Sequence, residues 1–423
     1  MAERWTRAEQ AIARSIRAPV SARSRYSLDA ANFFLAGLTG IGSPFLSALL
    51  RDHGWTYGPI GVAAAMPGLG VCLVQPFAGV GLDHARHPRV ILALASVAVG
   101  ACYASLPSLV RGPHSAVYLT LFGSGLAQAF FGPLLSGLAL GLVGPRHIDR
   151  TAGANEAFNH LGNVVASLIA LLVIGKDIAQ VFYLVGVYAM LAAASALSIR
   201  ERELDPHRAA GGTKKAVPLR DLLKDGRVLV LIASTTLFHT AYASAFPFIM
   251  LRARWAGGSD TTIAEMVFVS QAFMVPVAAV TGPLLGALGR KPVLGFGFVS
   301  LVVYLLICVF VHGPGALVGV QAFGSIGPSI LGVALIVICA DLTRGTGRFH
   351  ALTGATRTAM VAGAVIGTFA TGFLDDRLGY MLTIGALASI AAAAAALFIM
   401  RMPETLPIDG TVRAEASATA SQP

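Results

Sequence analysis

Long apolar stretches alternate with short polar ones along the 423 residues of the chain. A helix needs about 20 apolar residues to cross the hydrocarbon core of a bilayer. The apolar stretches reach this length, and they lack the strict apolar–polar alternation that marks the strands of a membrane barrel. The pattern predicts an all-α membrane protein with twelve transmembrane helices, at roughly 28–50, 57–81, 88–110, 116–143, 153–174, 179–199, 228–250, 262–287, 291–311, 315–340, 352–374 and 379–400.

The two halves of the chain repeat each other. The run Gly-Ala-Asn at 153–155 returns as Gly-Ala-Thr at 354–356, which is 201 residues later. Gly79 returns as Gly282, 203 residues later. Tandem repeats of this size in a membrane protein are typical of transporters, whose solute sites lie between the repeats. The repeat predicts two bundles of six helices.

The longest polar stretch lies between the sixth and seventh predicted helices. It covers 200–227, and we interpret it as a cytoplasmic linker that ends in a short amphipathic helix at 218–225. The predicted divisions are a basic N-terminal segment at 1–27, an N-terminal six-helix bundle at 28–199, the linker, a C-terminal six-helix bundle at 228–400 and a cytoplasmic tail at 401–423.

Charge orients these helices. Charged residues form 12% of the chain, against about 25% in an ordinary soluble domain. With both termini in the cytoplasm, all but six of the 31 Lys and Arg fall on the cytoplasmic side, as the positive-inside rule expects. This topology accounts for the net charge of +10 and leaves no basic domain for nucleic acid. We expect a monomer in the inner cell membrane.

Motifs of catalysis and of cofactor binding are missing from the sequence. There is no Gly-x-x-x-x-Gly-Lys-Ser/Thr loop for nucleotide hydrolysis, no His-Glu-x-x-His and no Gly-x-Ser-x-Gly. The four cysteines fall inside predicted helices without metal-type spacing. We therefore expect no enzymatic activity, no cofactor and no metal, which leaves a transporter driven by a gradient.

The turn after the second predicted helix carries a motif. Residues 79–89 read Gly-Val-Gly-Leu-Asp-His-Ala-Arg-His-Pro-Arg and resemble the Gly-x-x-x-Asp-basic-x-Gly-x-basic-basic turn of the major facilitator superfamily. The runs 155–160, 340–349 and 402–405 are similar to an uncharacterised bacterial branch of that superfamily. The resemblance implies the twelve-helix fold and alternating-access transport of a small organic solute, by export coupled to protons.

Three departures limit what the resemblance implies. The matching turn in the second half has Gly286 where Asp is usual, and the fourth helix has Gln128 but no Arg. The first helix has Gly37 where relatives carry an acid. Drug–proton antiport therefore cannot be transferred residue by residue.

Asp83 in the motif is a candidate conformational latch. Its carboxylate can accept hydrogen bonds from free N–H groups at a neighbouring helix start, or pair with Arg344 or Arg348. The alternative is a solvated loop acid. The predicted latch set is Gly79, Asp83, Arg86, Arg89, Arg344 and Arg348.

The resemblance also implies a central cavity lined by the first, fourth, seventh and tenth helices. These helices offer Asn32, Gln128, His239, Tyr242 and Gln321. This set contains no Arg or Lys clamp, which disfavours phosphorylated sugars and dicarboxylates. It suits a neutral, zwitterionic or amphipathic solute. Alternatively, the amides only bond across helices.

His239 is the leading candidate for proton coupling. It lies about 16 Å into the seventh helix at 1.5 Å per residue, and histidine titrates near neutral pH. The alternative is a neutral histidine bonded to a neighbouring helix. Glu156 and His160 share one face of the fifth helix, in a structural, gating or coupling role. Asp29 lies in the first turn of the first helix, where an acid favours the helix dipole.

Two other functions remain open at this stage. The chain can be an uptake carrier or uniporter, or a non-transporting sensor or assembly protein built on a transporter scaffold. The missing Asp at Gly286 and the missing acid at Gly37 are the features that favour the second.

Overall fold

The computed structural model describes residues 20–174, 178–212 and 216–406. Most of the predicted N-terminal segment 1–27 and of the tail 401–423 therefore lies outside the described residues. The first bundle contains α2 (Ala22–Asp52), α3 (Tyr57–Leu82), α4 (Pro88–Leu109), α5 (His114–Gln128), α6 (Phe131–Val143), α7 (Ile148–Ile174) and α8 (Ala179–Ser198).

The second bundle repeats this order. It contains α11 (Gly226–Trp255), α12 (Asp260–Leu288), α13 (Arg290–Phe310), α14 (Pro314–Gly324), α15 (Ile326–Leu342), α16 (Phe349–Leu378) and α17 (Tyr380–Arg401). Eleven spans among the described residues are long and apolar enough to cross a membrane. Helix α7 has 27 residues and is about 40 Å long, which provides the twelfth. The predicted all-α fold of two six-helix bundles is confirmed.

The fourth and tenth spans are each broken, which the hydropathy pattern did not predict. The pair α5 and α6 and the pair α14 and α15 replace the continuous helices expected at 116–143 and 315–340. Pro133 and Pro328 follow the two breaks directly. Proline has no N–H to donate to the carbonyl four residues earlier, and its ring clashes with that carbonyl. The two breaks therefore have the same local cause.

The first helix begins at Ala22, six residues before the predicted start at 28. The hydroxyl of Ser21 accepts a hydrogen bond from the backbone N–H of Ser24 (3.3 Å). A serine at this position satisfies one of the N–H groups that a helix start leaves free. The cap therefore extends the helix beyond its apolar part.

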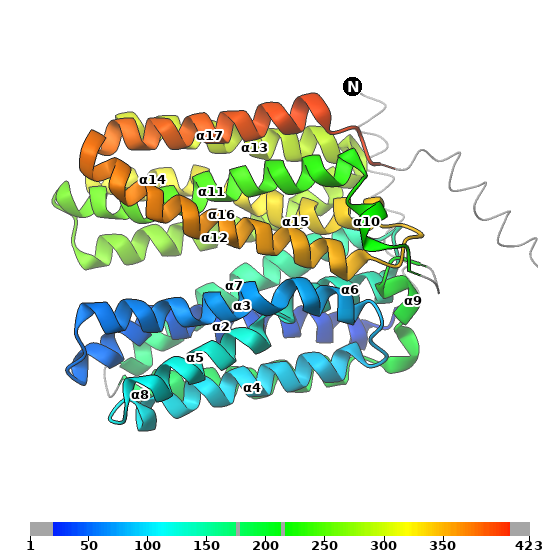
Figure 1. Ribbon diagram of the computed structural model, residues 1–423, viewed down its shortest axis with the longest axis horizontal. Coiled ribbons are helices and arrows are strands. Elements are labelled where there is room, and N and C mark those ends of the chain that lie inside the picture. Colours follow the sequence, from blue (N-terminus) through cyan, green and yellow to red (C-terminus); the bar gives the residue numbers. More distant parts are fainter. Residues whose placement is uncertain (1–19, 175–177, 213–215, 407–423) are drawn as a thin grey trace, which may run out of the picture.

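The two bundles converge at one end of the molecule and diverge at the other (Figure 1). The converging end carries the linker, which contains η1 (Glu201–Glu203), α9 (Pro206–Ala209) and α10 (Leu219–Leu222); we call it the linker end. The short helix predicted at 218–225 is the single turn α10. The linker packs on the turn before α16, where the N–H of Phe349 donates to the carbonyl of Ala210 (3.1 Å).

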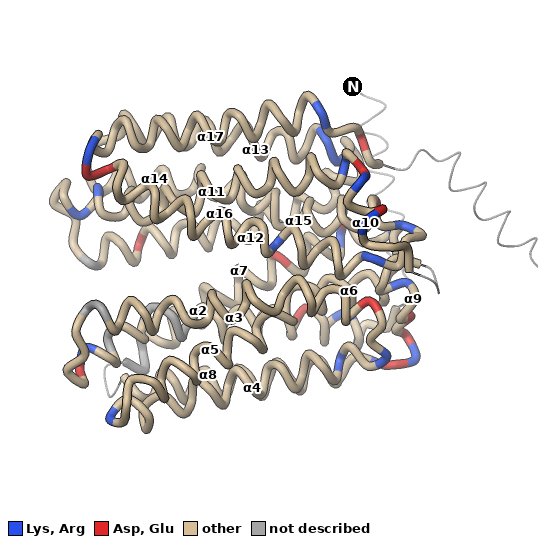
Figure 2. The backbone as a smooth tube through the Cα atoms, in the orientation of Figure 1, with Lys and Arg blue, Asp and Glu red and all other residues tan. Residues whose placement is uncertain are grey.

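Charged segments gather mainly at the ends of the bundles, and long uncharged lengths of helix run between them (Figure 2). Large apolar side chains are exposed along these lengths; Phe77, Ile366 and Phe369 are each at least 70% exposed. Exposed apolar surface of this extent is what a lipid-facing belt requires. Within the bundles, small residues allow close helix packing: a Cβ on Gly162 of α7 would lie 2.1 Å from the carbonyl oxygen of Phe33 on α2.

Candidate transport site between the bundles

Two seams join the bundles near the linker end: α3 packs on α16, and α7 packs on α12. Glycine makes both approaches possible. A Cβ on Gly79 would lie 2.5 Å from the carbonyl oxygen of His350, and a Cβ on Gly282 would lie 2.3 Å from that of Asp149. Gly79 and Gly282 are the repeated pair found in the sequence. The repeat therefore marks the points at which the two bundles touch.

Asp83 lies in the α3–α16 seam. Its Oδ1 accepts a hydrogen bond from the backbone N–H of His350 (2.9 Å), at the start of α16. Burial raises the pKa of Asp83 to about 7, against the lowering effects of the N–H groups of His350 and Ala351 and of the Arg348 charge. Of the two predicted arrangements for this acid, the structure has the helix-start contact.

His350 makes a second contact across the same seam. Its ring nitrogen Nδ1 lies 2.9 Å from the carbonyl oxygen of Pro133 on α6. A carbonyl only accepts, so Nδ1 must carry the proton. The ring fits because Gly137 has no side chain: a Cβ there would lie 1.9 Å from Cε1 of His350. His350 thus joins α16 to both α3 and α6, and no pattern in the sequence pointed to it.

The arginines of the predicted latch set lie in different places. Arg348 donates from Nε to the carbonyl of Val217 in the linker (2.7 Å), and Arg344 is 3.8 Å from Asp341. Among the described residues, neither Arg344 nor Arg348 forms an ion pair with Asp83 within 4 Å. Arg86 is exposed at the edge of a pocket beside the linker.

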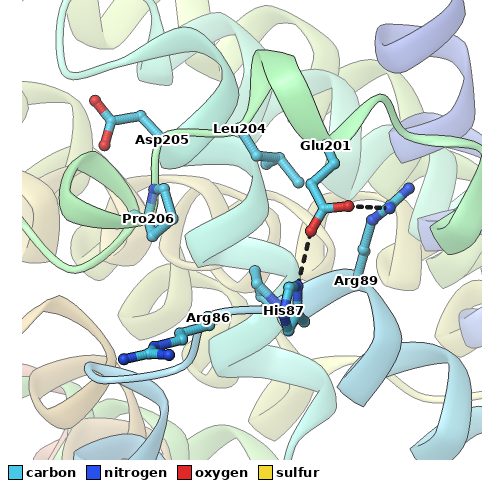
Figure 3. Close-up of a pocket in the computed structure, with 9 residues that line it drawn as sticks. Arg86, His87, Arg89, Glu201, Leu204, Asp205 and Pro206 are labelled. Atoms are coloured by element: carbon cyan, nitrogen blue, oxygen red, sulfur yellow. Dashed lines mark hydrogen bonds and ion pairs between the residues drawn. The ribbon is translucent and has the colours of Figure 1, made fainter.

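Arg89 ties α4 to the linker within the first bundle. Its guanidinium and the ring of His87 both contact the carboxylate of Glu201, with 2.7 Å for the His87 contact (Figure 3). The hydrogen bonds from His87 and Arg89 lower the pKa of Glu201. The basic end of the motif turn therefore anchors the linker and lies apart from Asp83.

The α7–α12 seam holds a buried charge cluster that the sequence analysis did not identify. Arg290, only 3% exposed, opens α13 and lies 2.9 Å from Oδ2 of Asp341 on α15. The same guanidinium lies 3.2 Å from Oδ2 of Asp149, which begins α7 in the other bundle. Arg290 also donates to the carbonyl of Leu285 (3.0 Å). One arginine therefore holds an acid from each bundle.

This cluster explains the missing acid at Gly286. By the repeat, Gly286 matches Asp83, and Asp149 matches His350. A Cβ on Gly286 would lie 3.1 Å from Oδ2 of Asp149. In the α7–α12 seam the acid therefore comes from α7, as Asp149, and the absence of a side chain at Gly286 leaves room for its carboxylate.

The run at 402–405 has a structural role beside the cluster. The carboxylate of Glu404 accepts from the backbone N–H groups of Arg290 (2.8 Å) and Lys291 (3.1 Å), which caps α13. Thr405 donates to Asp341 (3.3 Å). The end of α17 is thus fastened to the start of α13.

Polar contacts between the bundles continue beyond the glycine contacts, deeper into the helices. His160 on α7 lies 2.9 Å from Oε1 of Gln271 on α12. The hydroxyl of Thr358 on α16 donates to Oε1 of Gln75 on α3 (3.3 Å). Glu156 lies one turn before His160 on the same helix. Each seam therefore also carries a hydrogen bond between two side chains at this deeper level.

The predicted cavity residues are divided between an accessible face and buried contacts. His239 and Tyr242 are half-buried and lie on one face of α11, with ring centroids 6.5 Å apart. Gln128, also half-buried, ends α5 beside the break. Asn32 is 4% exposed and donates to the carbonyl of Leu28 in its own helix.

Gln321 and Asp29 are placed away from that face. Gln321 is 2% exposed and accepts a hydrogen bond from the Tyr304 hydroxyl (3.0 Å), within the second bundle. Asp29 lines a pocket with Arg25 and Arg150, on the linker-end portions of α2 and α7.

Arg357 lies between the bundles, although its charge alone groups it with the basic residues of the cytoplasmic side. It lies eight residues inside α16, and its guanidinium packs on α6 of the other bundle, where a Cβ on Gly132 would lie 3.1 Å from Nε. The missing side chain at Gly132 makes the room. The region between the bundles therefore does contain an arginine.

Sequence comparison identifies relatives over nearly the whole chain. A family model described as Major Facilitator Superfamily matches residues 28–257. An uncharacterised MFS-type transporter of Mycobacterium tuberculosis (strain H37Rv) is 31% identical over 405 residues, which cover 93% of this chain and 96% of the relative. The corresponding protein of strain CDC 1551 matches equally.

Solved structures share the fold at low identity. The human organic anion transporter MFSD10 has a TM-score of 0.73 at 13% identity, over 89% of this chain and 99% of that one. FucP in its outward conformation has a TM-score of 0.71 at 13% identity, over 90% and 98%. A bacterial homologue of ferroportin in an outward-facing state has 0.71 at 16%, over 89% and 99%. The chain belongs to the Major Facilitator Superfamily of transporters.

Proposed function

We propose that this protein is a secondary active transporter that exports a small organic solute across the inner membrane by alternating access, coupled to protons. The observation that carries the proposal is the construction of the two seams. They close the linker end through hydrogen bonds and one charge cluster that join opposite bundles. Contacts of this kind break and re-form without disturbing the interior of either bundle.

The orientation follows from charge. The linker end takes the cytoplasmic side, with both termini there, because Lys and Arg concentrate on cytoplasmic loops. The present conformation, closed at the linker end, then corresponds to an outward-facing state. Two of the similar solved structures are outward-facing, which supports this assignment.

Two alternative functions, a non-transporting sensor or assembly protein and an uptake carrier or uniporter, give the contacts between the bundles a different role. A sensor or assembly protein on this scaffold was favoured by the missing acid at Gly286, but Asp149 supplies an acid at the same seam. The second seam therefore does not lack an acid, and the argument for a non-transporting sensor or assembly protein is weaker. Uptake or uniport by the same bundles remains the second candidate, and dependence of flux on an imposed pH gradient separates it from proton-coupled export.

The half-buried face around His239 and Tyr242 suits a neutral, zwitterionic or amphipathic solute, handled by a monomer. The face combines aromatic rings with few hydrogen-bonding groups. Aromatic side chains combine an apolar body with a polar tip.

Cysteine accessibility tests both the orientation and the alternation. After replacement of the native cysteines by alanine, we expect Ala256→Cys to react with an impermeant thiol reagent in intact cells. We expect Gln75→Cys, buried in the closed seam, to react only in inverted vesicles, and slowly, because it is exposed only when the linker end opens. A Gln75→Cys variant that never reacts in inverted vesicles would contradict alternating access. Reaction of Ala256→Cys only in inverted vesicles would reverse the orientation.

His239→Gln tests proton coupling. Glutamine keeps hydrogen-bonding capacity and approximate size but does not titrate near neutral pH. We expect the variant to lose the dependence of flux on a pH gradient in reconstituted vesicles, while solute binding and downhill movement persist. Thr240→Val on the same helix is the matched control, because among the described residues the Thr240 hydroxyl bonds only to the carbonyl of Thr236, within its own helix. Continued accumulation of solute by His239→Gln under a pH gradient would transfer the role to Glu156, His160 or Asp29.

A further inference from the structure

Glu156 and Arg357 occupy the same position in the two repeats. Glu156 follows the run Gly-Ala-Asn at 153–155, and Arg357 follows its copy Gly-Ala-Thr at 354–356, so the two are also 201 residues apart. Each lies eight residues after the start of its helix, α7 or α16. At 1.5 Å per residue this is about 12 Å along the helix from its start. The repeat therefore places an acid and a base at matching depths, one in each bundle.

Each of the two side chains lies against a glycine of the opposite bundle. A Cβ on Gly132 of α6 would lie 3.1 Å from Cδ and Nε of Arg357. A Cβ on Gly332 of α15 would lie 3.5 Å from Cδ and Oε2 of Glu156. Gly132 is the second residue of α6, beside the break after α5, whereas Gly332 is the seventh residue of α15. Both charges therefore lie between the bundles, and Arg357 also lies beside a helix break.

Neither charge is neutralised within the described protein. Glu156 and Arg357 make no ion pair or hydrogen bond through their side chains with each other or with any other described residue, and both are partly exposed. A charge inside a membrane protein normally has a partner, because leaving it unpaired costs several kcal/mol. Both side chains are therefore open to a partner that is not part of the described chain.

We infer that Glu156 and Arg357 are the two poles of one solute site, in which Glu156 binds an ammonium group and Arg357 binds a carboxylate of the same zwitterionic molecule. A guanidinium binds a carboxylate through two parallel hydrogen bonds, and a carboxylate accepts readily from an ammonium group. Because the poles belong to different bundles, one bound molecule contacts both bundles at once. The inference rests on the transport function proposed above and specifies its solute class.

Opposite charges at symmetric positions are also compatible with an ion pair that forms in another conformation. Binding experiments separate the two. The probes are α-amino acids, ω-amino acids and dipeptides, tested by thermal shift and calorimetry on the purified full-length protein. For each that binds, the amide (ammonium only) and the deaminated acid (carboxylate only) are then tested. We expect both analogues to bind about tenfold more weakly or worse, since each leaves one charge of the site unpaired.

Single neutralisations should change this selectivity in opposite ways. Glu156→Gln should bind the zwitterion and the deaminated acid equally, because the ammonium no longer has a partner. Arg357→Gln should bind the zwitterion and the amide equally. Glu265→Gln and Arg401→Gln, which neutralise an exposed acid and an exposed base outside the site, should keep wild-type selectivity. Size-exclusion profiles verify that each variant is folded.

The double variant Glu156→Gln/Arg357→Gln decides between ligand and ion pair. A two-pole site predicts the weakest zwitterion binding of the series, whereas an ion pair predicts recovery relative to the single variants. Recovery, or no probe that binds the wild type, would overturn the inference. Transport of some other solute with no zwitterion bound would leave the proposed function standing. Zwitterion binding with the expected pattern but no flux in vesicles would leave the site standing and remove the transport function.

Discussion

Arg290→Met is expected to lower the stability of the purified protein by about 3–5 kcal/mol, because removing one partner leaves a buried charge uncompensated. The side chain of Asp341 is 3% exposed, and its carboxylate loses the guanidinium at 2.9 Å. Asp149 loses its partner from the other bundle at the same time. Denaturant unfolding in detergent, with and without the substitution, measures the effect.

Arg344→Met is the matched control for this experiment. Arg344 is near the same carboxylate, but its closest approach to Asp341 is 3.8 Å and its side chain is 28% exposed. A partly exposed pair at this distance contributes under about 1 kcal/mol. Adding Asp341→Asn to Arg290→Met should recover part of the loss, since the buried charge is then removed. Equal destabilisation by Arg290→Met and Arg344→Met would show that the cluster does not stabilise the fold.

The two contacts of Arg290 differ in which bundles they join. Arg290 and Asp341 both belong to the second bundle, whereas Asp149 belongs to the first. In the transport cycle proposed above, opening of the linker end breaks the contact with Asp149 and preserves the one with Asp341. The Arg290–Asp341 pair then serves as a structural contact, and the Asp149 contact is made only while the seam is closed.

The sequence predicts the helices and the repeat well, because both depend on local patterns of about 20 residues or on direct self-comparison. The breaks in the fourth and tenth spans were missed, although Pro133 and Pro328 are visible in the sequence. A hydropathy window averages over a single proline and reports one continuous apolar stretch. The early start at Ala22 was missed for a similar reason, since a serine cap extends a helix into polar sequence.

The candidate site shows where sequence reasoning ends. Asp83 was selected because it lies in a recognisable turn, and its backbone partner was one of two arrangements weighed. Arg290, Asp149 and His350 were not selected, because their contacts depend on how one bundle faces the other. Arg357 is not among the predicted site residues, because charge alone groups it with the basic residues of the cytoplasmic side. Only the packing against Gly132 moves it into the region between the bundles.

Asp83→Asn is expected to slow transport several-fold while leaving folded yield and solute affinity near the wild-type values. The amide oxygen still accepts from the N–H of His350, so the seam keeps its geometry. The amide, however, imitates the protonated acid and cannot ionise, so the closed state no longer has to bury a carboxylate. Flux in reconstituted vesicles and ligand affinity on the same preparation measure the two quantities. Asp221→Asn, an exposed acid in α10, is the control.

The same residue should make closure of the linker end depend on pH. Burial raises the pKa of Asp83 from 3.8 to about 7 in the closed state, whereas hydration on opening returns it toward 3.8. The closed state therefore binds the proton more tightly, and its stability is greatest below about pH 4 and is lost as pH rises through about 7. At 1.36 kcal/mol for each pKa unit, the difference reaches about 4 kcal/mol.

Accessibility of Gln75→Cys from the linker end reports this balance directly. Its labelling rate in inverted vesicles should rise between about pH 5 and pH 7 in wild-type background, after correction for thiolate fraction with an always exposed cysteine. In Asp83→Asn the rate should stay flat, at the low value of the acidic wild type. Arg348, the charged group that faces Asp83 from the start of α16, opposes the shift, so Arg348→Gln should move the wild-type midpoint to higher pH. A labelling rate that depends on pH equally with and without Asp83 would make this acid a solvated loop residue, and another titrating group would then control the seam.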